Sequence, residues 1–170
     1  MKAKTLQYIR EYKWSNILAM IRNNLKDPKI CPDGFQDRLV VISGATSGIG
    51  YACAQKYASR GANLLCINRN PEKSEKLRAG IEGKYGVKCD ILIADLSRMD
   101  DVFRVSRELA RMSVPIDVLI HNAGVYLTKR ELTSDGFEYV FALHYLAPYI
   151  MTYLSMDKLM AQDKARIIMV

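Results

Sequence analysis

The chain has 170 residues, of which 49% are hydrophobic and 25% are charged, and its formal net charge is +7. This length and composition are typical of one globular domain with a sizeable core, which excludes a disordered or fibrous protein. The positive charge does not predict nucleic-acid binding, because the basic residues are spread along the chain and form no basic and aromatic cluster.

Residues 1–37 carry an apolar stripe at helical spacing, accompanied by lysines and arginines. Pro28 and Pro32 break this pattern before the next element begins. We expect an N-terminal helical extension that buries its stripe on the rest of the chain, as amphipathic helices usually do. The alternative is a basic helix that touches an anionic membrane surface or a partner. The stripe consists of Leu6, Ile9, Trp14, Ile17, Leu18, Ile21 and Leu25.

From residue 38 onward, short apolar strands alternate with helical patterns. This alternation indicates a parallel sheet covered on both faces. Right-handed crossovers then favour a doubly wound α/β sheet of the Rossmann type over residues 38–170, which ends at about its fifth strand. The predicted strands are 38–42, 63–68, 88–94, 115–121 and 165–170. The predicted helices are 48–60, 71–84, 98–112 with Ser97 as its cap, and a long helix from Ser134 or Asp135 to about residue 160.

The first predicted strand runs directly into the sequence SGATSGIG at residues 43–50, and then into a helix. Main-chain N–H groups and the helix dipole make such a helix start attractive to a phosphate. Gly44 permits the tight turn, while Gly48 and Gly50 let the backbone and the helix approach a pyrophosphate. The alternative interpretation is that these are ordinary turn glycines.

The four cysteines are far apart and include no Cys-x-x-Cys pair, which argues against a zinc site and against a disulfide framework. No apolar run approaches the roughly 20 residues that span a bilayer, and the N-terminus lacks the apolar region of a signal peptide. We expect no metal site and a reducing, cytoplasmic location, with membrane association only through residues 1–37.

Four motifs, in this order, resemble the short-chain dehydrogenase/reductase family. Residues 43–50 resemble its TGxxxGxG cofactor motif with Ser for Thr, and Asp95 with Leu96 matches its adenine-contacting position. The sequence HNAG at residues 121–124 resembles its NNAG motif, and residues 132–149 resemble the retinol-dehydrogenase-like branch. Each of the first three motifs follows a predicted strand, where open α/β sheets bind ligands.

The resemblance implies a nicotinamide dinucleotide cofactor. The glycine loop would hold its pyrophosphate. Asn122 would line the adenine-ribose and nicotinamide side of the cofactor, and it is alternatively, or in addition, a structural turn residue that bridges neighbouring strands. The implied cofactor-binding residues are Gly44, Ser47, Gly48, Ile49, Gly50, Asn68, Arg69, Asp95, Leu96, Asn122, Ala123 and Gly124.

The end of the second strand favours NADP over NAD. NAD-selective sites usually place Asp or Glu there to bind the ribose hydroxyls, whereas this chain has Arg69. A guanidinium fork suits a phosphate, and by resemblance Arg69 matches the arginine of NADP-dependent members, assisted by Asn68. The alternative is a solvated loop arginine.

The implied activity is hydride transfer between NADP and an alcohol or carbonyl substrate. The family carries its chemistry on a Ser and a YxxxK motif, yet none of the ten tyrosines is followed by Lys at the fourth position. We therefore expect an N-terminal portion that is inactive alone, or else a non-catalytic dinucleotide-binding module or a truncated product. His144 occupies the family's Asn position, where it either relays protons or fills space. The resemblance also suggests a homodimer.

Overall fold

The computed structural model describes residues 14–26 and 32–170. Contacts divide the chain into two units, residues 1–33 and residues 34–170. In the first unit, helix α2 (Trp14–Asn24) forms over part of the predicted stripe. The stripe positions Leu6 and Ile9 lie outside the described residues. Within the described ranges no helix is both long enough and apolar enough to cross a membrane.

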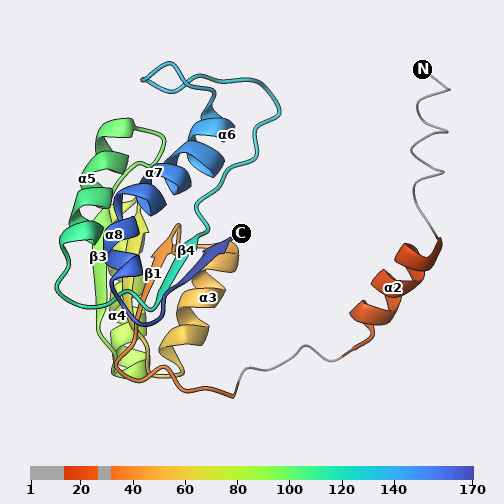
Figure 1. Ribbon diagram of the computed structural model, residues 1–170, viewed down its shortest axis with the longest axis vertical. Helices are drawn as coiled ribbons and strands as arrows, with labels where there is room; N and C mark the ends of the chain where they lie inside the picture. The colour runs from red at the N-terminus through yellow and green to blue at the C-terminus, as the bar shows by residue number, and fades with distance from the viewer. Residues whose placement is uncertain (1–13, 27–31) are drawn as a thin grey trace. The chain divides into compact units, whose positions relative to one another are not determined.

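The second unit is built on one five-stranded parallel sheet with the order β3-β2-β1-β4-β5 (Figure 1). The chain winds outward from β1 in one direction and then returns to its other side, so the strand order reverses between β1 and β4. This confirms the doubly wound Rossmann prediction and places a ligand-binding switch point beside β1. The strands are β1 (Leu39–Ser43), β2 (Asn63–Asn68), β3 (Cys89–Ile93), β4 (Val118–His121) and β5 (Arg166–Met169).

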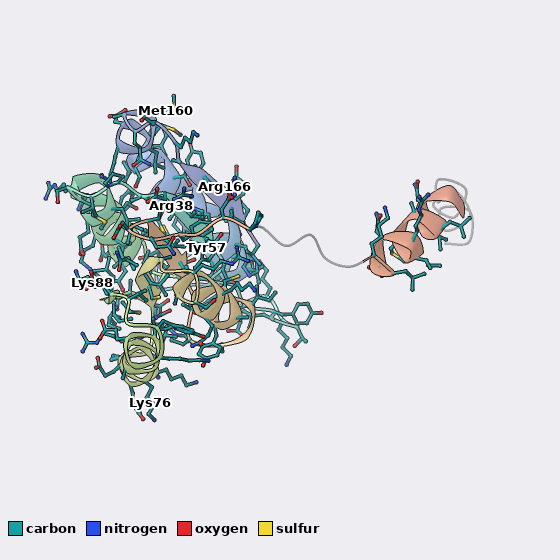
Figure 2. All side chains as sticks on the ribbon, turned by 90° about the horizontal axis from the view of Figure 1, so that it is seen from below. Arg38, Tyr57, Lys76, Lys88, Met160 and Arg166 are labelled. Carbon is teal, nitrogen blue, oxygen red and sulfur yellow. The ribbon has the colours of Figure 1, made fainter. Side chains whose placement is uncertain are left out.

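Helices cover both faces of the sheet (Figure 1). On one face, α3 (Gly48–Ala58) and α4 (Pro71–Tyr85) pack over Val40 and Ile42. On the other face, Val41 packs in the core beneath the helices at 99–111, 147–154 and 156–160, because successive strand residues point to opposite faces. Figure 2 shows Lys76 on the outer side of α4, away from the sheet. The other helices are α5 (Met99–Arg111), α7 (Ala147–Leu154) and α8 (Met156–Met160).

The prediction of one long helix up to residue 160 is wrong, because the segment is divided into several shorter helices. Helix α6 (Tyr139–Phe141) passes into a π-helical turn, η1 (Ala142–Leu146), before α7 and α8. Pro148, in the first turn of α7, has no N–H to bond back to the preceding turn, which accounts for the widened turn before it.

The caps predicted for two helices also differ from the structure. Glu138, and neither Ser134 nor Asp135, caps α6 by accepting from the N–H groups of Val140 and Phe141. Ser97 does not cap α5, because the N-cap position is Arg98, and the Ser97 hydroxyl donates to Asp95 Oδ1. Asp135 instead accepts the Met99 N–H of α5 at 2.9 Å, across 36 positions of sequence.

Candidate functional site

A cleft of about 720 Å³ lies at the carboxyl ends of the strands, beside the point where the strand order reverses. Its size is in the range of small-molecule and cofactor sites. The predicted site residues that line it are Gly44, Ser47, Ile49, Asn68, Arg69, Asp95, Leu96, Asn122, Ala123, Gly124 and His144. Gly48 and Gly50 do not line it.

Two glycines of the loop are required by close packing. A Cβ on Gly50 would lie 2.2 Å from the Gly44 oxygen and 2.4 Å from Asn122 Nδ2. A Cβ on Gly44, whose φ is +71°, would lie 2.9 Å from the Ala123 Cα. The absence of a side chain at both positions therefore lets the loop pack closely against α3 and against the end of β4. Gly50 contributes to this packing without lining the cleft itself.

The helix start in this loop leaves its polar groups available. Ser47 is the N-cap of α3 in an extended conformation, and its side chain makes no capping hydrogen bond. Gly48 has a φ of +56°, and a Cβ there would meet nothing within 4 Å. The 63% exposed side chain of Ile49 lines the cleft beside them. An uncapped helix start facing an open cleft fits an anionic ligand group.

Asn122 ties the ends of β1 and β4 together. Its Nδ2 donates to the main-chain oxygens of Ser43 and Gly44 at 3.1 and 2.9 Å. Ser43 Oγ accepts the N–H groups of Asn122 and Ala123, both at 3.0 Å. The structural role expected as one alternative for Asn122 is therefore present, and the residue also lines the cleft.

Asn68 presents an unpaired donor at the cleft wall. Its Oδ1 accepts the Ala45 N–H at 2.8 Å, which holds the glycine loop against β2. The side chain is only 3% exposed, and its Nδ2 has no hydrogen-bond partner among the described residues. Since buried amides are normally paired, this orphaned donor fits a ligand that carries oxygen acceptors.

Asp95 is held in a tight turn after β3. Its Oδ1 accepts from the N–H and the hydroxyl of Ser97 at 3.0 and 2.7 Å, while its own N–H donates to Asp101 Oδ2. Burial raises the pKa of Asp101, but hydrogen bonds from Arg104 and from the Asp95 N–H bring that pKa below its usual value. The turn is thus fixed around a charged carboxylate. Leu96 is mostly buried in the core beside it.

Positive charge gathers at the β2 side of the cleft. Arg69 and Lys73 both line it, from the turn after β2 and the first turn of α4. Within the described part of the chain neither forms an ion pair, and the nearby carboxylate of Glu72 is paired with Lys76 at 2.7 Å. Arg69 Nη1 donates to the Tyr139 hydroxyl at 3.2 Å. This end of the cleft suits an anion.

His144 contacts the main chain that follows β4. Its Nε2 accepts the Val125 N–H at 2.8 Å and lies 3.0 Å from the Val125 oxygen. The imidazole also packs on Gly124, where a Cβ would lie 3.0 Å from Cε1. His144 therefore holds the loop at residues 123–125 in place.

Several cleft residues were not predicted. Lys73 could have been found from its place one helical turn after Arg69, beside the predicted start of α4. Tyr139 carried no signal, because only folding brings it to Arg69 across 70 positions of sequence. The remaining unpredicted lining residues are Thr46, Asn70, Ala94, Val125, Tyr126, Leu143 and Val170.

Comparison with known proteins agrees with this architecture. The family model of the short chain dehydrogenases matches residues 38–170. Human polyprenol dehydrogenase is 31% identical over 85% of this chain and 44% of its own length. Mouse retinol dehydrogenase 13 is 33% identical over 77% of this chain and 40% of its own length. The chain thus spans less than half of these curated relatives.

A solved structure shares the same fold. It is a short-chain dehydrogenase from Sphingobium yanoikuyae in complex with NADPH, which is 29% identical and covers 76% of this chain and 51% of that protein, with a TM-score of 0.69. The family model, the relatives and the ordered motifs point to one conclusion. The chain belongs to the short-chain dehydrogenase family, among relatives of the retinol-dehydrogenase-like kind.

Proposed function

We propose that this chain binds NADP(H) in the cleft, as part of an oxidoreductase that transfers hydride between the cofactor and an alcohol or carbonyl substrate. One observation carries the proposal. The cleft joins the uncapped start of α3 at one end to Arg69 and Lys73 at the other, and among the described residues no acid pairs with these two cations.

The residues fit the cofactor part by part. The start of α3, with Gly44, Ser47 and Ile49, would hold the pyrophosphate through main-chain N–H groups. Asn68 would give its orphaned Nδ2 to a cofactor oxygen. Arg69 would offer its planar fork to the 2′-phosphate, with Lys73 as a point charge beside it.

The far wall of the cleft would orient the reactive ring. When bound, NADP(H) supplies the hydride chemistry, which leaves the protein to bind and orient it. Asp95 would meet the adenine from its fixed turn, and Ala123 and Gly124 would line the nicotinamide side. We assign His144 the support of this wall through Val125, and its share in proton transfer remains a prediction.

A binding titration of the 170-residue chain tests the proposal. NADPH and NADH are titrated by fluorescence and by thermal shift against the wild type, Arg69→Gln and Arg78→Gln. Arg78 is the matched control, because it removes one charge from α4 outside the cleft. We expect NADPH to bind more tightly than NADH, and Arg69→Gln alone to weaken NADPH by about tenfold or more, since a charged hydrogen bond is lost.

Two results would contradict the proposal. Failure of the folded wild type to bind either dinucleotide would overturn cofactor binding as a whole. Preference for NADH, unchanged in Arg69→Gln, would overturn only the assignment of NADP and of the arginine.

A non-catalytic dinucleotide-binding module is the second candidate. One sequence feature favours it, namely His144 in place of the family's Asn. A transcript that continues past Val170 into a Ser and a YxxxK motif would remove this candidate. Turnover of an alcohol by the protein it encodes would support the oxidoreductase.

We also propose that the protein forms a homodimer through an exposed aromatic row. The row consists of Phe141, Tyr145, Tyr149 and Tyr153, whose successive rings stack at 5.3, 6.3 and 6.0 Å. Exposed rings in such a row favour burial against a partner. Sedimentation equilibrium of the wild type and of Tyr149→Glu tests this, with dissociation to a monomer expected for the variant.

A cytoplasmic location and membrane contact through residues 1–37 remain predictions.

A further inference from the structure

Tyr139 meets Arg69 at the rim of the cleft. The Arg69 Nη1 donates to the Tyr139 hydroxyl at 3.2 Å, and both residues line the cleft. The arginine belongs to the turn between β2 and α4, while the tyrosine is the first residue of α6. The side chains of two segments that lie far apart in the sequence therefore meet at the rim of the cleft.

The backbone of Tyr139 is fixed from several directions. Its N–H donates to the Glu131 oxygen at 3.0 Å, next to an antiparallel bridge between Leu132 and Glu138. The Glu138 carboxylate accepts the N–H groups of Val140 and Phe141, which follow Tyr139, at 3.1 and 2.7 Å. A tyrosine on such a backbone has only two side-chain torsions with a few discrete rotamers, which limits the positions that its hydroxyl can take.

Arg69 has no comparable support of its own. Its side chain is long and exposed, and within the described ranges no carboxylate forms an ion pair with it. One N–H given to the tyrosine oxygen leaves four others on the same planar group. Because the hydrogen bond already restricts the guanidinium, the arginine loses less side-chain entropy when it binds an anion.

We propose that Tyr139 is a positioning residue that orients Arg69 toward the 2′-phosphate of the cofactor and so sets the selectivity for phosphorylated adenosine. This inference rests on the proposed function, because it needs the phosphate to bind at Arg69. Tyr139 itself acts through the arginine.

The test compares two probes that differ only in the 2′-phosphate, adenosine 2′,5′-bisphosphate and 5′-AMP. Affinities are measured by calorimetry for the wild type, Tyr139→Phe, Arg69→Gln and the double variant. Tyr85→Phe is the matched control, because it also loses one tyrosine hydrogen bond, to Gln55 at 2.8 Å, outside the cleft. Thermal unfolding of each variant reports on folding.

We expect Tyr139→Phe to weaken the bisphosphate by ~3- to 10-fold, the loss of one hydrogen bond, and to leave 5′-AMP unchanged. In the Arg69→Gln background the same change has no effect, because there is no arginine left to orient. Tyr85→Phe keeps the wild-type ratio of the two affinities.

The outcomes separate this inference from the proposed function. A wild type that binds both probes equally contradicts the phosphate site, and the inference with it. A selective wild type whose ratio persists in Tyr139→Phe overturns the inference alone. Equal weakening of both probes with a lower unfolding temperature identifies a structural role and overturns it too, as does an undiminished effect of Tyr139→Phe in the Arg69→Gln background.

Discussion

The side-chain amide of Asn122 donates to the main-chain oxygen of Gly44 at 2.9 Å, which joins the loops after β4 and β1. Its second N–H donates to the Ser43 oxygen at 3.1 Å. These loops flank the point where the strand order reverses, so their spacing sets the width of the cleft. The side-chain amide of Asn122 thus contributes both to the stability of the fold and to the shape of the cleft.

Asn122→Asp tests this coupling, because it replaces a donor with a carboxylate oxygen that faces two carbonyl oxygens. We expect the free energy of unfolding to fall by about 1–3 kcal/mol, the cost of unmatched polar groups. Asn63→Asp is the control, since Asn63 uses only its acceptor, for the Lys88 N–H. Urea unfolding measures both, and equal stability of the two variants would contradict the role given to Asn122.

Gly50→Ala is expected to disrupt the glycine loop. The new methyl group would clash with the Gly44 oxygen at 2.2 Å, so the loop or α3 must shift. We expect a loss of about 1–3 kcal/mol in unfolding free energy, as for other overpacked sites, together with weaker NADPH binding. Gly80→Ala in α4 meets nothing within 4 Å and should gain about 0.5–1 kcal/mol. A Gly50→Ala protein that matches the wild type in both assays would refute this packing argument.

Asp135→Ala is expected to destabilise helix α5 and not the helix that follows Asp135. The variant removes the acceptor of the Met99 N–H, and loss of such a cap costs about 0.5–2 kcal/mol. Amide hydrogen exchange should therefore increase in the first turn of α5. Ser134→Ala is the control. It should leave amide exchange in both helices unchanged, because the Ser134 hydroxyl caps neither α5 nor α6. Faster exchange confined to α6 would contradict the assignment.

The sheet was predictable because its determinants are local. The run of apolar residues at 39–42, for example, is long enough for a strand and is followed at once by the glycine loop. Parallel pairing then follows from the helices between strands, and it brings the ends of β1, β2 and β4 to one edge. The cleft positions of Arg69, Asp95 and Asn122 come from this rule and not from their own side chains.

The helix boundaries and the rim of the cleft were not predictable in this way. Asp135 was a plausible cap for the helix after it, yet its carboxylate serves α5 through a contact that only the fold creates. The π-helical turn before Pro148 likewise depends on a missing N–H one turn later. Tyr139 likewise lies at the cleft only because folding brings it to Arg69, 70 positions away in the sequence. Sequence patterns report local geometry, whereas these features depend on how distant segments meet.

His121 is a buried titratable group at the end of β4. It is 4% exposed, and its Nε2 lies 3.0 Å from Thr152 Oγ1. Burial lowers the pKa of this imidazole from 6.5 to about 4. The folded protein therefore keeps His121 neutral at a pH where the unfolded chain would protonate it.

The stability of the protein should consequently fall on acidification through the window between pH 6.5 and 4, because there the unfolded state binds one more proton. The contribution of His121 is complete above pH 6.5 and amounts to about 2 kcal/mol between pH 7 and 5. Hydrogen bonds from the Phe141 and Val140 N–H groups lower the pKa of the Glu138 carboxylate, so its contribution to stability is lost as the pH falls below the usual pKa of a glutamate. Urea unfolding at pH 7, 6 and 5 should show a flatter profile for His121→Asn than for the wild type. Parallel profiles for the wild type and His121→Asn would show that the buried imidazole is not the source of the acid sensitivity.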